Sequence, residues 1–305
     1  MTSIQLVRLT VGAGINLLSL AAPKRAGNLA LNIFCHPPKP RLREKERKFL
    51  ATADRLDFIF EGKSIAVYSW GGEPDRILPR DQDLPFILLS YGWGYNAGRW
   101  RYFVQPLLEA GYRVIAFDPP GHGYSHSGLL DYPTMVRLQK AMVYRFGAPE
   151  LFLGHSFGGS CFVGALNELK LEDHPSRICL LGTFSEARWL FRSFRRGIGL
   201  SRRVYAELKH SLLRRTGESV ASFDNALMGS RLGHIACLFM HDPADKTTAF
   251  SNAIRNHAYW PGSALYEAKG AGHHLSTADT TAITIDWLIN GQLPLKAIIS
   301  PGLSD

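Results

Sequence analysis

Residues 154–160 read GHSFGGS, and they place Ser156 between glycines two positions before it and two positions after it. A serine hydroxyl attacks a carbonyl carbon when a histidine removes its proton and a carboxylate holds that histidine in the right tautomer. Backbone N–H groups must also face the oxyanion that forms. A sharp turn between a strand and a helix supplies one such amide, and it needs small residues where Gly154 and Gly158 stand. The motif therefore marks a candidate nucleophile.

Two later segments carry a matching acid and base. The segment HDPADK holds Asp242 and Asp245, and the segment GAGHH holds His273 and His274. Each segment follows a short apolar run that the pattern predicts as a strand. In open α/β sheets, sites form at the carboxyl ends of the strands. The chain order Ser, Asp, His, with each residue just past a predicted strand, indicates a catalytic triad more strongly than any one motif.

Short apolar runs alternate with helix-like segments through most of the chain. Strands are predicted over residues 58–60, 64–70, 86–90, 113–117, 151–153, 177–181, 235–240 and 264–267. Helices are predicted over residues 100–110, 133–146, 157–170 and 280–289. We therefore predict an α/β fold, with a twisted, mostly parallel sheet of about eight strands and helices on both faces.

The alternation stops between residues 186 and 231, where apolar residues recur at helical spacing and no strand is predicted. We expect this segment to be a helical insertion in a core formed by residues 55–185 and 232–305. Residues 1–54 precede the core and combine apolar with basic residues. We expect them to form a helical, basic extension.

The composition is that of an ordinary globular protein, because 305 residues at 46% hydrophobic can bury one substantial core. Four widely spaced cysteines form no CxxC pair, which argues against a disulfide framework or a zinc site and favours a reducing compartment. The net charge is +9, from 35 Lys and Arg against 26 Asp and Glu. Basic residues cluster from Lys39 to Lys48 and, more densely, from Arg188 to Arg215. The charge is compatible with anionic partners but selects none of them.

The N-terminal region raises the question of targeting. Residues 11–22 form an apolar stretch after Arg8, and Ser19-Leu20-Ala21 within it has the small-residue pattern of a signal cleavage site. The stretch is too short to cross a bilayer as a helix. Apolar residues continue beyond it, which favours amphipathic helices that pack on the domain or lie on a membrane surface. We therefore expect a cytoplasmic protein, with peripheral membrane contact through this segment as an open alternative, rather than a cleaved signal peptide.

The motifs together resemble those of the α/β-hydrolase fold superfamily, in its serine-nucleophile, esterase- and lipase-like branch, over roughly residues 55–292. GHSFGGS resembles the nucleophile elbow, and FDPPGHGYS resembles the loop after the fourth strand. HDPADK resembles the acid loop and GAGHH the histidine loop. YGWG resembles the His-Gly-x-Gly oxyanion segment, with Tyr91 in place of the histidine.

This resemblance implies a role for each matched residue. It makes Ser156 the nucleophile, Asp245 the acid and His273 the base, and it assigns the oxyanion hole to the backbone amides of Trp93 and Phe157. It also implies a reaction without a cofactor or a metal ion.

Two assignments have competitors within their own motifs. Asp242 competes with Asp245, but the family's acid stands fifth in a His-Gly-x-x-Asp pattern, which leaves Asp242 as a turn or capping residue. His274 competes with His273, but the family's histidine directly follows the glycine. Three further polar residues are expected to be structural: His122, His155 and Asp118.

The identity of the nucleophile narrows the chemistry. Epoxide hydrolases and haloalkane dehalogenases of this fold use aspartate, so Ser156 argues against both. Serine favours cleavage of a carboxylic ester or thioester through an acyl-enzyme. An acyltransferase with the same triad stays open, and His274 with Asp279 matches the His-x4-Asp spacing of some acyltransferases. A non-catalytic member of the fold that binds a small molecule or a protein is the other alternative.

The insertion is the candidate for substrate choice, because in this fold a segment between the sixth and seventh strands forms a cap over the site. Candidate substrate contacts are Trp189 and Phe194 in the insertion and Tyr91 beside the oxyanion segment. The arginines of the insertion raise the hypothesis of an anionic substrate, such as an acyl-CoA thioester, or of an anionic lipid surface. No nucleic-acid partner is expected.

Overall fold

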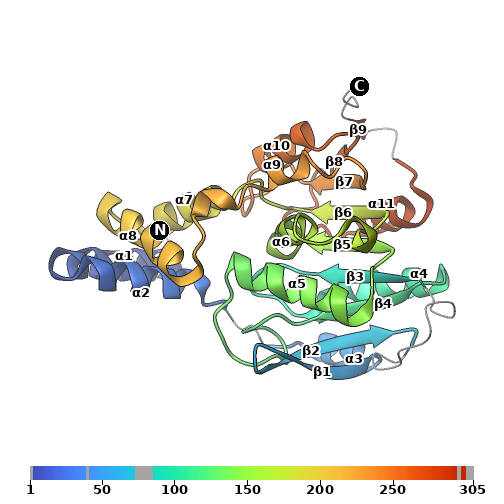
Figure 1. Cartoon of the computed structure of the whole chain (residues 1–305), viewed down its shortest axis with the longest axis horizontal. Coiled ribbons are helices and arrows are strands. Elements are labelled where there is room, and N and C mark those ends of the chain that lie inside the picture. The colour runs from blue at the N-terminus through green and yellow to red at the C-terminus, as the bar shows by residue number, and fades with distance from the viewer. Residues whose placement is uncertain (1–2, 39–40, 73–84, 294–296, 300–305) are drawn as a thin grey trace. The chain divides into compact units, whose positions relative to one another are not determined.

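The computed structural model describes residues 3–38, 41–72, 85–293 and 297–299. It divides into two compact units (Figure 1). The larger unit holds residues 38–185 and 225–305, and the smaller unit holds residues 1–37 and 186–224. Two boundaries differ from the expected division, because residues 38–54 and 225–231 belong to the larger unit. The N-terminal segment and the insertion form one unit together.

A nine-stranded sheet runs through the described part of the larger unit, in the order β1-β2-β4-β3-β5-β6-β7-β8-β9 (Figure 1). Its strands are β1 Asp54–Phe60, β2 Lys63–Trp70, β3 Phe86–Ser90, β4 Arg113–Phe117, β5 Leu151–His155, β6 Arg177–Leu181, β7 Ala236–His241, β8 Ala264–Glu267 and β9 Ile298–Ile299. Strands β3 to β8 are parallel to their neighbours, whereas β2 is antiparallel to β1 and β4, and β9 is antiparallel to β8. The predicted α/β class and the mostly parallel sheet are confirmed.

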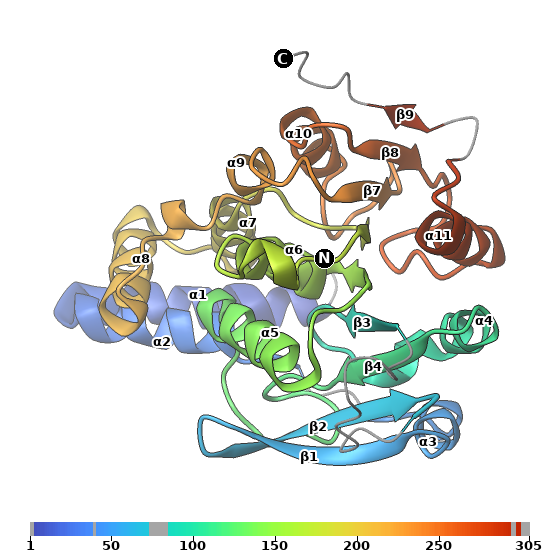
Figure 2. The same ribbon diagram turned by 45° about the vertical axis from the view of Figure 1, so that its right-hand side comes forward.

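Helices cover both faces of this sheet (Figure 2). One layer contains α5 Tyr132–Phe146, α6 Ser156–Leu166, α9 Asn225–Gly229 and α10 Ser251–Tyr259, and the other contains α3 Glu44–Leu50, α4 Val104–Glu109 and α11 Ala278–Asn290. Every residue of β3, β4 and β5 is buried as a result. Strands covered on both sides read as continuous apolar runs, which is why the sequence showed runs rather than alternation.

One helix predicted over residues 100–110 is in fact two elements. A 3-10 helix spans Ala97–Tyr102, and α4 begins afresh at Val104. Pro106 lies in the first turn of α4, where its missing N–H costs no helical hydrogen bond. Within a single longer helix the same proline would have interrupted the hydrogen-bond ladder.

The register of the parallel strands fixes where the site lies. Ser90 pairs with Gly154, His155 pairs with Leu181, and His241 pairs with Glu267, so β3, β5, β6, β7 and β8 end at one edge of the sheet. The YGWG, GHSFGGS, HDPADK and GAGHH segments all begin at this edge. Segments far apart in the sequence are thereby brought to one place.

The smaller unit consists of α1 Ser3–Ala21, α2 Pro23–Cys35, α7 Ala187–Ile198 and α8 Arg202–Thr216. Helix α2 packs on α8, and α1 packs on α2 and α7. Gly27 allows this approach, because a Cβ atom there would lie 2.6 Å from the Glu207 carbonyl carbon. The Asn16 side chain joins the two segments by donating to the Gly199 carbonyl (2.9 Å) and accepting from the Ser201 amide (2.8 Å). None of the helices in the described ranges is long and apolar enough to cross a membrane.

Candidate active site

Ser156 stands at the junction of β5 and α6 in a strained conformation. Its φ is 51°, in the left-handed region that non-glycine residues rarely adopt. The flanking glycines are required by close backbone approach. A Cβ atom on Gly158 would collide with the carbonyl oxygen of Tyr91, and one on Gly154 would collide with the Cα of Gly159. The two glycines therefore let the sharp turn lie close to the neighbouring backbone, with Ser156 at the edge of the sheet.

The structure brings together the three residues predicted as a triad. His273 Nε2 lies 3.1 Å from Ser156 Oγ, and His273 Nδ1 lies 2.7 Å from Asp245 Oδ2. Because the carboxylate accepts a hydrogen bond from Nδ1–H, Nε2 is left as the acceptor that faces the serine hydroxyl. This arrangement can accept a proton from Ser156 and stabilise the imidazolium that results.

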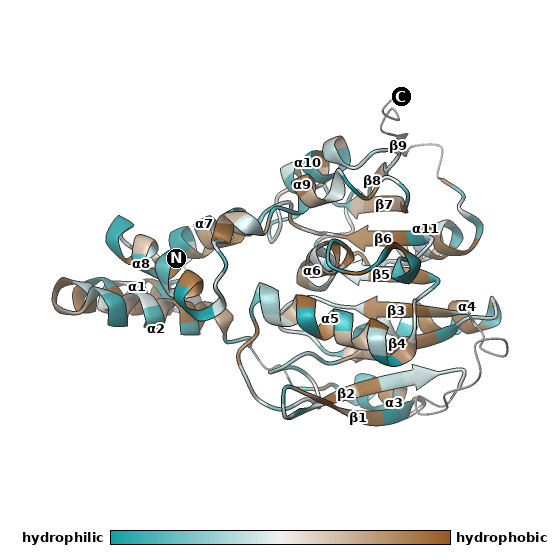
Figure 3. Cartoon of the chain, in the orientation of Figure 1, coloured by the Kyte–Doolittle hydropathy of each residue, from teal (hydrophilic) through white to brown (hydrophobic). Residues whose placement is uncertain are grey.

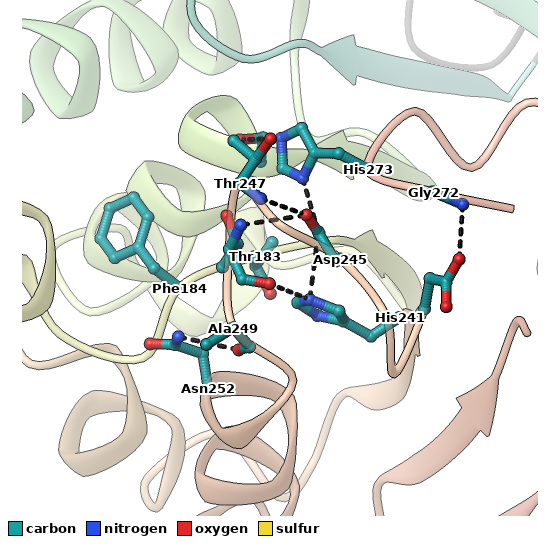
Figure 4. A network of polar contacts seen from close by, with 12 residues as sticks. Thr183, Phe184, His241, Asp245, Thr247, Ala249, Asn252, Gly272 and His273 are labelled. Atoms are coloured by element: carbon teal, nitrogen blue, oxygen red, sulfur yellow. Dashed lines mark hydrogen bonds and ion pairs between the residues drawn. The ribbon is translucent and has the colours of Figure 1, made fainter. Parts of the chain in front are cut away.

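Asp245 is held as a carboxylate by four donors, most of which Figure 4 shows. Its Oδ1 accepts from the amides of Thr247 (2.7 Å) and Thr248 (3.1 Å), and its Oδ2 lies 3.3 Å from His241 Nε2 as well as beside His273. Burial alone would raise the pKa of Asp245, but the hydrogen bonds from His241 and His273 outweigh burial and hold the pKa well below its ordinary value. The acid therefore stays ionised beside the base.

His241 is a residue that the sequence reading missed. It ends β7 with only 1% of its surface exposed, and its Nε2–H also donates to the Thr248 carbonyl at 2.8 Å. Its Nδ1 has no hydrogen-bond partner within the described ranges. His241 thus presents a second N–H to Asp245. Its position, at a strand end four residues before the acid, is the signal that could have identified it.

Asp242 joins the acid loop to the histidine loop. Its Oδ1 accepts from the Ala244 amide at 2.8 Å, as a turn residue does, and its Oδ2 accepts from the Gly272 amide at 2.6 Å. Asp242 does not contact the imidazole of His273, for which Asp245 is the carboxylate partner. Its contacts are those of a loop-fixing residue.

The other histidines near the triad contact backbone or aromatic groups. His155 Nε2 donates to the His273 carbonyl at 2.8 Å. Burial, followed by the charge of Arg99, lowers the pKa of His155 well below its ordinary value, so the ring is neutral. The ring of His274 hydrogen-bonds the Tyr95 hydroxyl at 2.9 Å, and its carbonyl accepts from Arg99 Nη2 at 2.9 Å. Among the described residues, neither ring hydrogen-bonds the Ser156 hydroxyl, whose partner is His273 Nε2.

The residues expected to form the oxyanion hole, Trp93 and Phe157, come from the YGWG segment and from the start of α6. The Phe157 amide lies in the first turn of α6, where the helix dipole favours negative charge. The ring of Trp93 packs edge-on against that of Phe157, with centroids 5.0 Å apart. His122 fixes the next residue, because its Nε2 accepts from the Gly94 amide at 2.9 Å while its Nδ1 donates to the Pro120 carbonyl at 3.0 Å. The FDPPGHGYS loop thus positions the YGWG segment.

Tyr91, an expected substrate contact, lies in a buried hydrogen-bonded network. Only 1% of its surface is exposed, and its hydroxyl donates to Asp118 Oδ1 at 2.5 Å inside the unit. Asp118 also accepts from the Tyr68 hydroxyl (2.7 Å) and the Ala97 amide (2.8 Å). The side chain is therefore enclosed in a hydrogen-bonded network with a buried carboxylate, and the predicted substrate contact of Tyr91 finds no support in this arrangement.

The two other expected substrate contacts lie on α7 of the smaller unit. Phe194 packs against Phe34 of α2, with ring centroids 5.0 Å apart, and Trp189 is half-buried. Their contact with a substrate stays a prediction.

The cysteine thiols are poorly placed to act as nucleophiles in place of Ser156. The four cysteine thiols are free and buried, and burial raises the pKa of Cys179 to about 12 and that of Cys161 and Cys237 well above the ordinary value. In the described part of the chain, no cluster of three or more His, Cys, Asp and Glu side chains could hold a metal ion.

Similarity to curated proteins covers about half of the chain. A hydrolase of 2-hydroxy-6-oxo-6-phenylhexa-2,4-dienoate from Burkholderia cepacia is 30% identical over 155 residues, which are 48% of this chain and 53% of that protein. A 2-hydroxy-6-oxononadienedioate/2-hydroxy-6-oxononatrienedioate hydrolase from Comamonas testosteroni matches to the same extent. The chain spans about half the length of these curated relatives.

Solved structures share the fold at low sequence identity. Alpha/beta hydrolase domain-containing protein 10 from mouse superimposes with a TM-score of 0.57 at 14% identity, covering 78% of this chain and 98% of that chain. The thioesterase domain from the curacin biosynthetic pathway superimposes with a TM-score of 0.55 at 16% identity, covering 78% and 99%. The sequence pattern of the "Alpha/beta hydrolase family" matches residues 86–284, about two thirds of the chain. The chain belongs to the α/β-hydrolase family.

Proposed function

We propose that the protein is a serine hydrolase that cleaves a carboxylic ester or thioester through an acyl-enzyme. The observation that carries this proposal is the continuous contact from Ser156 Oγ to His273 Nε2 (3.1 Å) and from His273 Nδ1 to Asp245 Oδ2 (2.7 Å). Nucleophile, base and acid are thus in hydrogen-bonding reach before any substrate binds.

The first half-reaction acylates the serine. His273 Nε2 takes the proton of Ser156 Oγ as that oxygen attacks the carbonyl carbon, and the carbonyl π electrons move to the oxygen. The amides of Phe157 and Trp93 stabilise this oxyanion. The intermediate then collapses, the bond to the alcohol or thiol breaks, and the leaving group takes the proton from His273. Asp245 stays a carboxylate throughout and stabilises the imidazolium.

The second half-reaction uses water as the nucleophile. His273 removes a proton from the water molecule as the water oxygen attacks the acyl carbon. The bond between that carbon and Ser156 Oγ then breaks, Oγ takes the proton back from His273, and the carboxylic acid is released. No step requires a cofactor or a metal ion.

A second candidate is hydrolysis of an unsaturated oxo-carboxylate. Two relatives that are 30% identical to this chain over 155 residues are named as hydrolases of 2-hydroxy-6-oxo dienoates or dienedioates. The same serine and histidine would act on the keto carbonyl of such a compound. A substrate panel distinguishes the two candidates.

The test is a hydrolysis panel of neutral esters and acyl-CoA thioesters of graded chain length, together with a 2-hydroxy-6-oxo dienoate. We expect Ser156→Ala and His273→Gln to lower kcat by at least about three orders of magnitude. Ser127→Ala is the matched control, because Ser127 is exposed and lies outside the triad. A fluorophosphonate probe should label the wild-type protein and the control but not Ser156→Ala. Near-normal turnover by Ser156→Ala would contradict the mechanism, and faster acyl transfer to an added alcohol than to water would favour an acyltransferase.

A further inference from the structure

A cavity of about 360 Å³ in the larger unit lies beside the loops of the triad but does not include Ser156. Its wall contains Gly94 of the oxyanion segment and His274 of the histidine loop, which directly follow Trp93 and His273 in the chain. Other parts of its wall come from residues just before and in α3 and from the 3-10 helix Ala97–Tyr102. The cavity thus shares two loops with the catalytic groups.

The charge of this cavity is strongly positive. Its wall carries the four guanidinium groups of Arg41, Arg43, Arg99 and Arg101 against the single carboxylate of Glu46. That carboxylate is already engaged, since its Oε2 accepts from the Arg43 amide (2.8 Å) and from the side-chain amide of Asn96 (3.2 Å). None of the four arginines forms an ion pair with an acidic side chain of the described residues.

Arg99 is the buried member of this set, with 5% of its surface exposed. Its Nη2 donates to the His274 carbonyl, but its Nε and Nη1 have no hydrogen-bond partner within the described ranges. Its guanidinium lies over the rings of Trp100 (4.8 Å) and Tyr95 (5.4 Å), which stabilise a cation. Burial lowers the pKa of Arg99 to about 10, so it remains charged at neutral pH. A buried charge without a counter-ion is costly, and an anion in the cavity would supply the missing charge.

We propose that this cavity binds a phosphate group, carried by the substrate or free in solution. Several guanidinium groups around one cavity suit a multivalent oxyanion better than they suit a single carboxylate, because the exposed guanidinium groups of Arg41 and Arg43 can each donate two parallel hydrogen bonds to phosphate oxygens. For a substrate-borne phosphate the inference rests on the proposed function, and it narrows the substrate to a phosphate-bearing ester or thioester whose acyl group lies at Ser156.

The test is a direct binding measurement by titration calorimetry with inorganic phosphate and with CoA, which needs no turnover. The variant is Arg41→Ala with Arg43→Ala, because both side chains are exposed and the Arg43 amide keeps its bond to Glu46. Arg47→Ala with Lys48→Ala, on the exposed side of α3 and outside the cavity, is the matched control. We expect phosphate or CoA to bind the wild-type protein and the control, and the Kd to rise on the order of tenfold in the cavity variant.

Kinetics then identify the source of the phosphate. If the cavity variant has a higher KM than the wild-type protein for an acyl-CoA but not for a neutral ester, the substrate carries the phosphate. If the variant only binds inorganic phosphate more weakly, the cavity is a site for the free ion. Failure of both phosphate and CoA to bind the wild-type protein, or equal affinities in variant and control, would overturn the proposal. Ester hydrolysis that persists in that case leaves the serine mechanism standing.

A different observation concerns helix α1 of the smaller unit. Its packed face includes Ile15 and Ser19, each 2% exposed, yet Leu17 and Leu20 are 70% and 68% exposed. Among the side chains of this helix that the structure describes, six large apolar ones are exposed: Leu6, Val7, Val11, Leu17, Leu18 and Leu20. At 100° per residue they cover about half of the helix circumference. Figure 3 shows the hydrophobic colouring along α1.

The same unit carries nearly all of the net charge of the chain. Its residues include twelve Lys and Arg against four Asp and Glu, out of a net charge of +9 for the whole protein. An apolar face on a unit with a surplus of cations is complementary to a bilayer surface that contains anionic lipids, where apolar side chains enter the acyl boundary and cations bind the headgroups. A second copy of the unit would bring like charges together.

The geometry points to α1 as a helix that docks the protein on an anionic lipid surface, lying in the plane of the interface. The test is co-sedimentation with vesicles of phosphatidylcholine with or without phosphatidylglycerol. We expect binding to the vesicles with phosphatidylglycerol, weakened by added salt.

Leu17→Glu with Leu20→Glu should abolish most of this binding, because both side chains are exposed and the changes leave the packed face intact. Leu171→Glu is the matched control, since Leu171 is 73% exposed in the larger unit. Absence of binding by the wild-type protein, or a dimer in light scattering that the double variant dissociates, would overturn the proposal.

Discussion

His155 Nε2 lies 2.8 Å from the backbone carbonyl oxygen of His273 and donates a hydrogen bond to it. The residue that precedes the candidate nucleophile therefore holds the loop of the candidate base, and within the described ranges neither ring nitrogen of His155 hydrogen-bonds the serine. His155 is 2% exposed, and burial keeps its ring neutral. The hydrogen bond from the neutral His155 ring thus links the nucleophile elbow to the histidine loop.

The stability of the fold should fall in mild acid because of this ring. Burial lowers the pKa of His155 in the folded state well below its ordinary value of 6.5, so as the pH falls below 6.5 the unfolded chain takes up a proton that the folded chain does not. The stabilisation is therefore present above pH 6.5 and is lost below it, at up to about 1.4 kcal/mol per pH unit. Urea unfolding between about pH 7.5 and about pH 5 measures this slope.

His155→Gln should make the slope shallower, since the side chain keeps a donor but cannot titrate. His210→Gln is the matched control, because His210 is exposed. Equal slopes for the wild-type protein and His155→Gln would show that His155 does not titrate on unfolding.

Asp242 should act on catalysis through the position of His273. Asp242→Ala leaves the Gly272 amide without its 2.6 Å acceptor, one residue before the base. We expect a loss of about 1–3 kcal/mol in the free energy of unfolding and a fall in kcat of about one to two orders of magnitude, with KM little changed. Asp242→Asn keeps an acceptor oxygen and should recover most of the kcat. Similar kcat values for the two variants would refute a positioning role.

The triad loops could be predicted because chain order and strand ends suffice to bring them together. Ser156, Asp245 and His273 each follow an apolar run, and parallel strands end at one edge of a sheet, so no side-chain detail is needed. The direction of a side chain beyond the end of a strand cannot be predicted in this way. Tyr91 follows Ser90, the last residue of β3, and the alternation of faces no longer applies there. Its burial against Asp118 depends on packing that spacing does not record.

The pairing of residues 1–37 with residues 186–224 could not be predicted for a related reason. Each segment has helical spacing, but periodicity does not state which helices meet. No sequence motif marks Gly27, although it allows α2 to approach Glu207 of α8. The role of His241 could not be predicted either. The sequence shows only that His241 begins the acid-loop motif, whereas its contact with Asp245 depends on where its side chain lies in the fold.

Gly158 should tolerate no side chain. A Cβ atom there would collide with the Tyr91 carbonyl oxygen and lie 2.7 Å from the Ser90 carbonyl carbon, and backbone atoms on that side cannot rotate away. Gly158→Ala should therefore lower the free energy of unfolding by about 1–3 kcal/mol and reduce kcat, because the oxyanion segment must shift. Gly14→Ala is the contrasting change, since Gly14 lies in α1 with open space around it, and helix propensity favours alanine. An unchanged urea midpoint for Gly158→Ala would contradict the close approach.

Tyr91→Phe separates a structural tyrosine from a substrate contact. The change removes a 2.5 Å hydrogen bond to the buried carboxylate of Asp118, which keeps its bonds from Tyr68 and Ala97. Hydrogen bonds to charged groups contribute about 1.5–3 kcal/mol, so the free energy of unfolding should fall by about that amount. KM should stay within about twofold of the wild-type value for any ester that is hydrolysed, because the side chain is enclosed. Tyr144→Phe, at an exposed tyrosine, should change neither quantity. A several-fold rise in KM without a loss of stability would instead place the Tyr91 hydroxyl against the substrate.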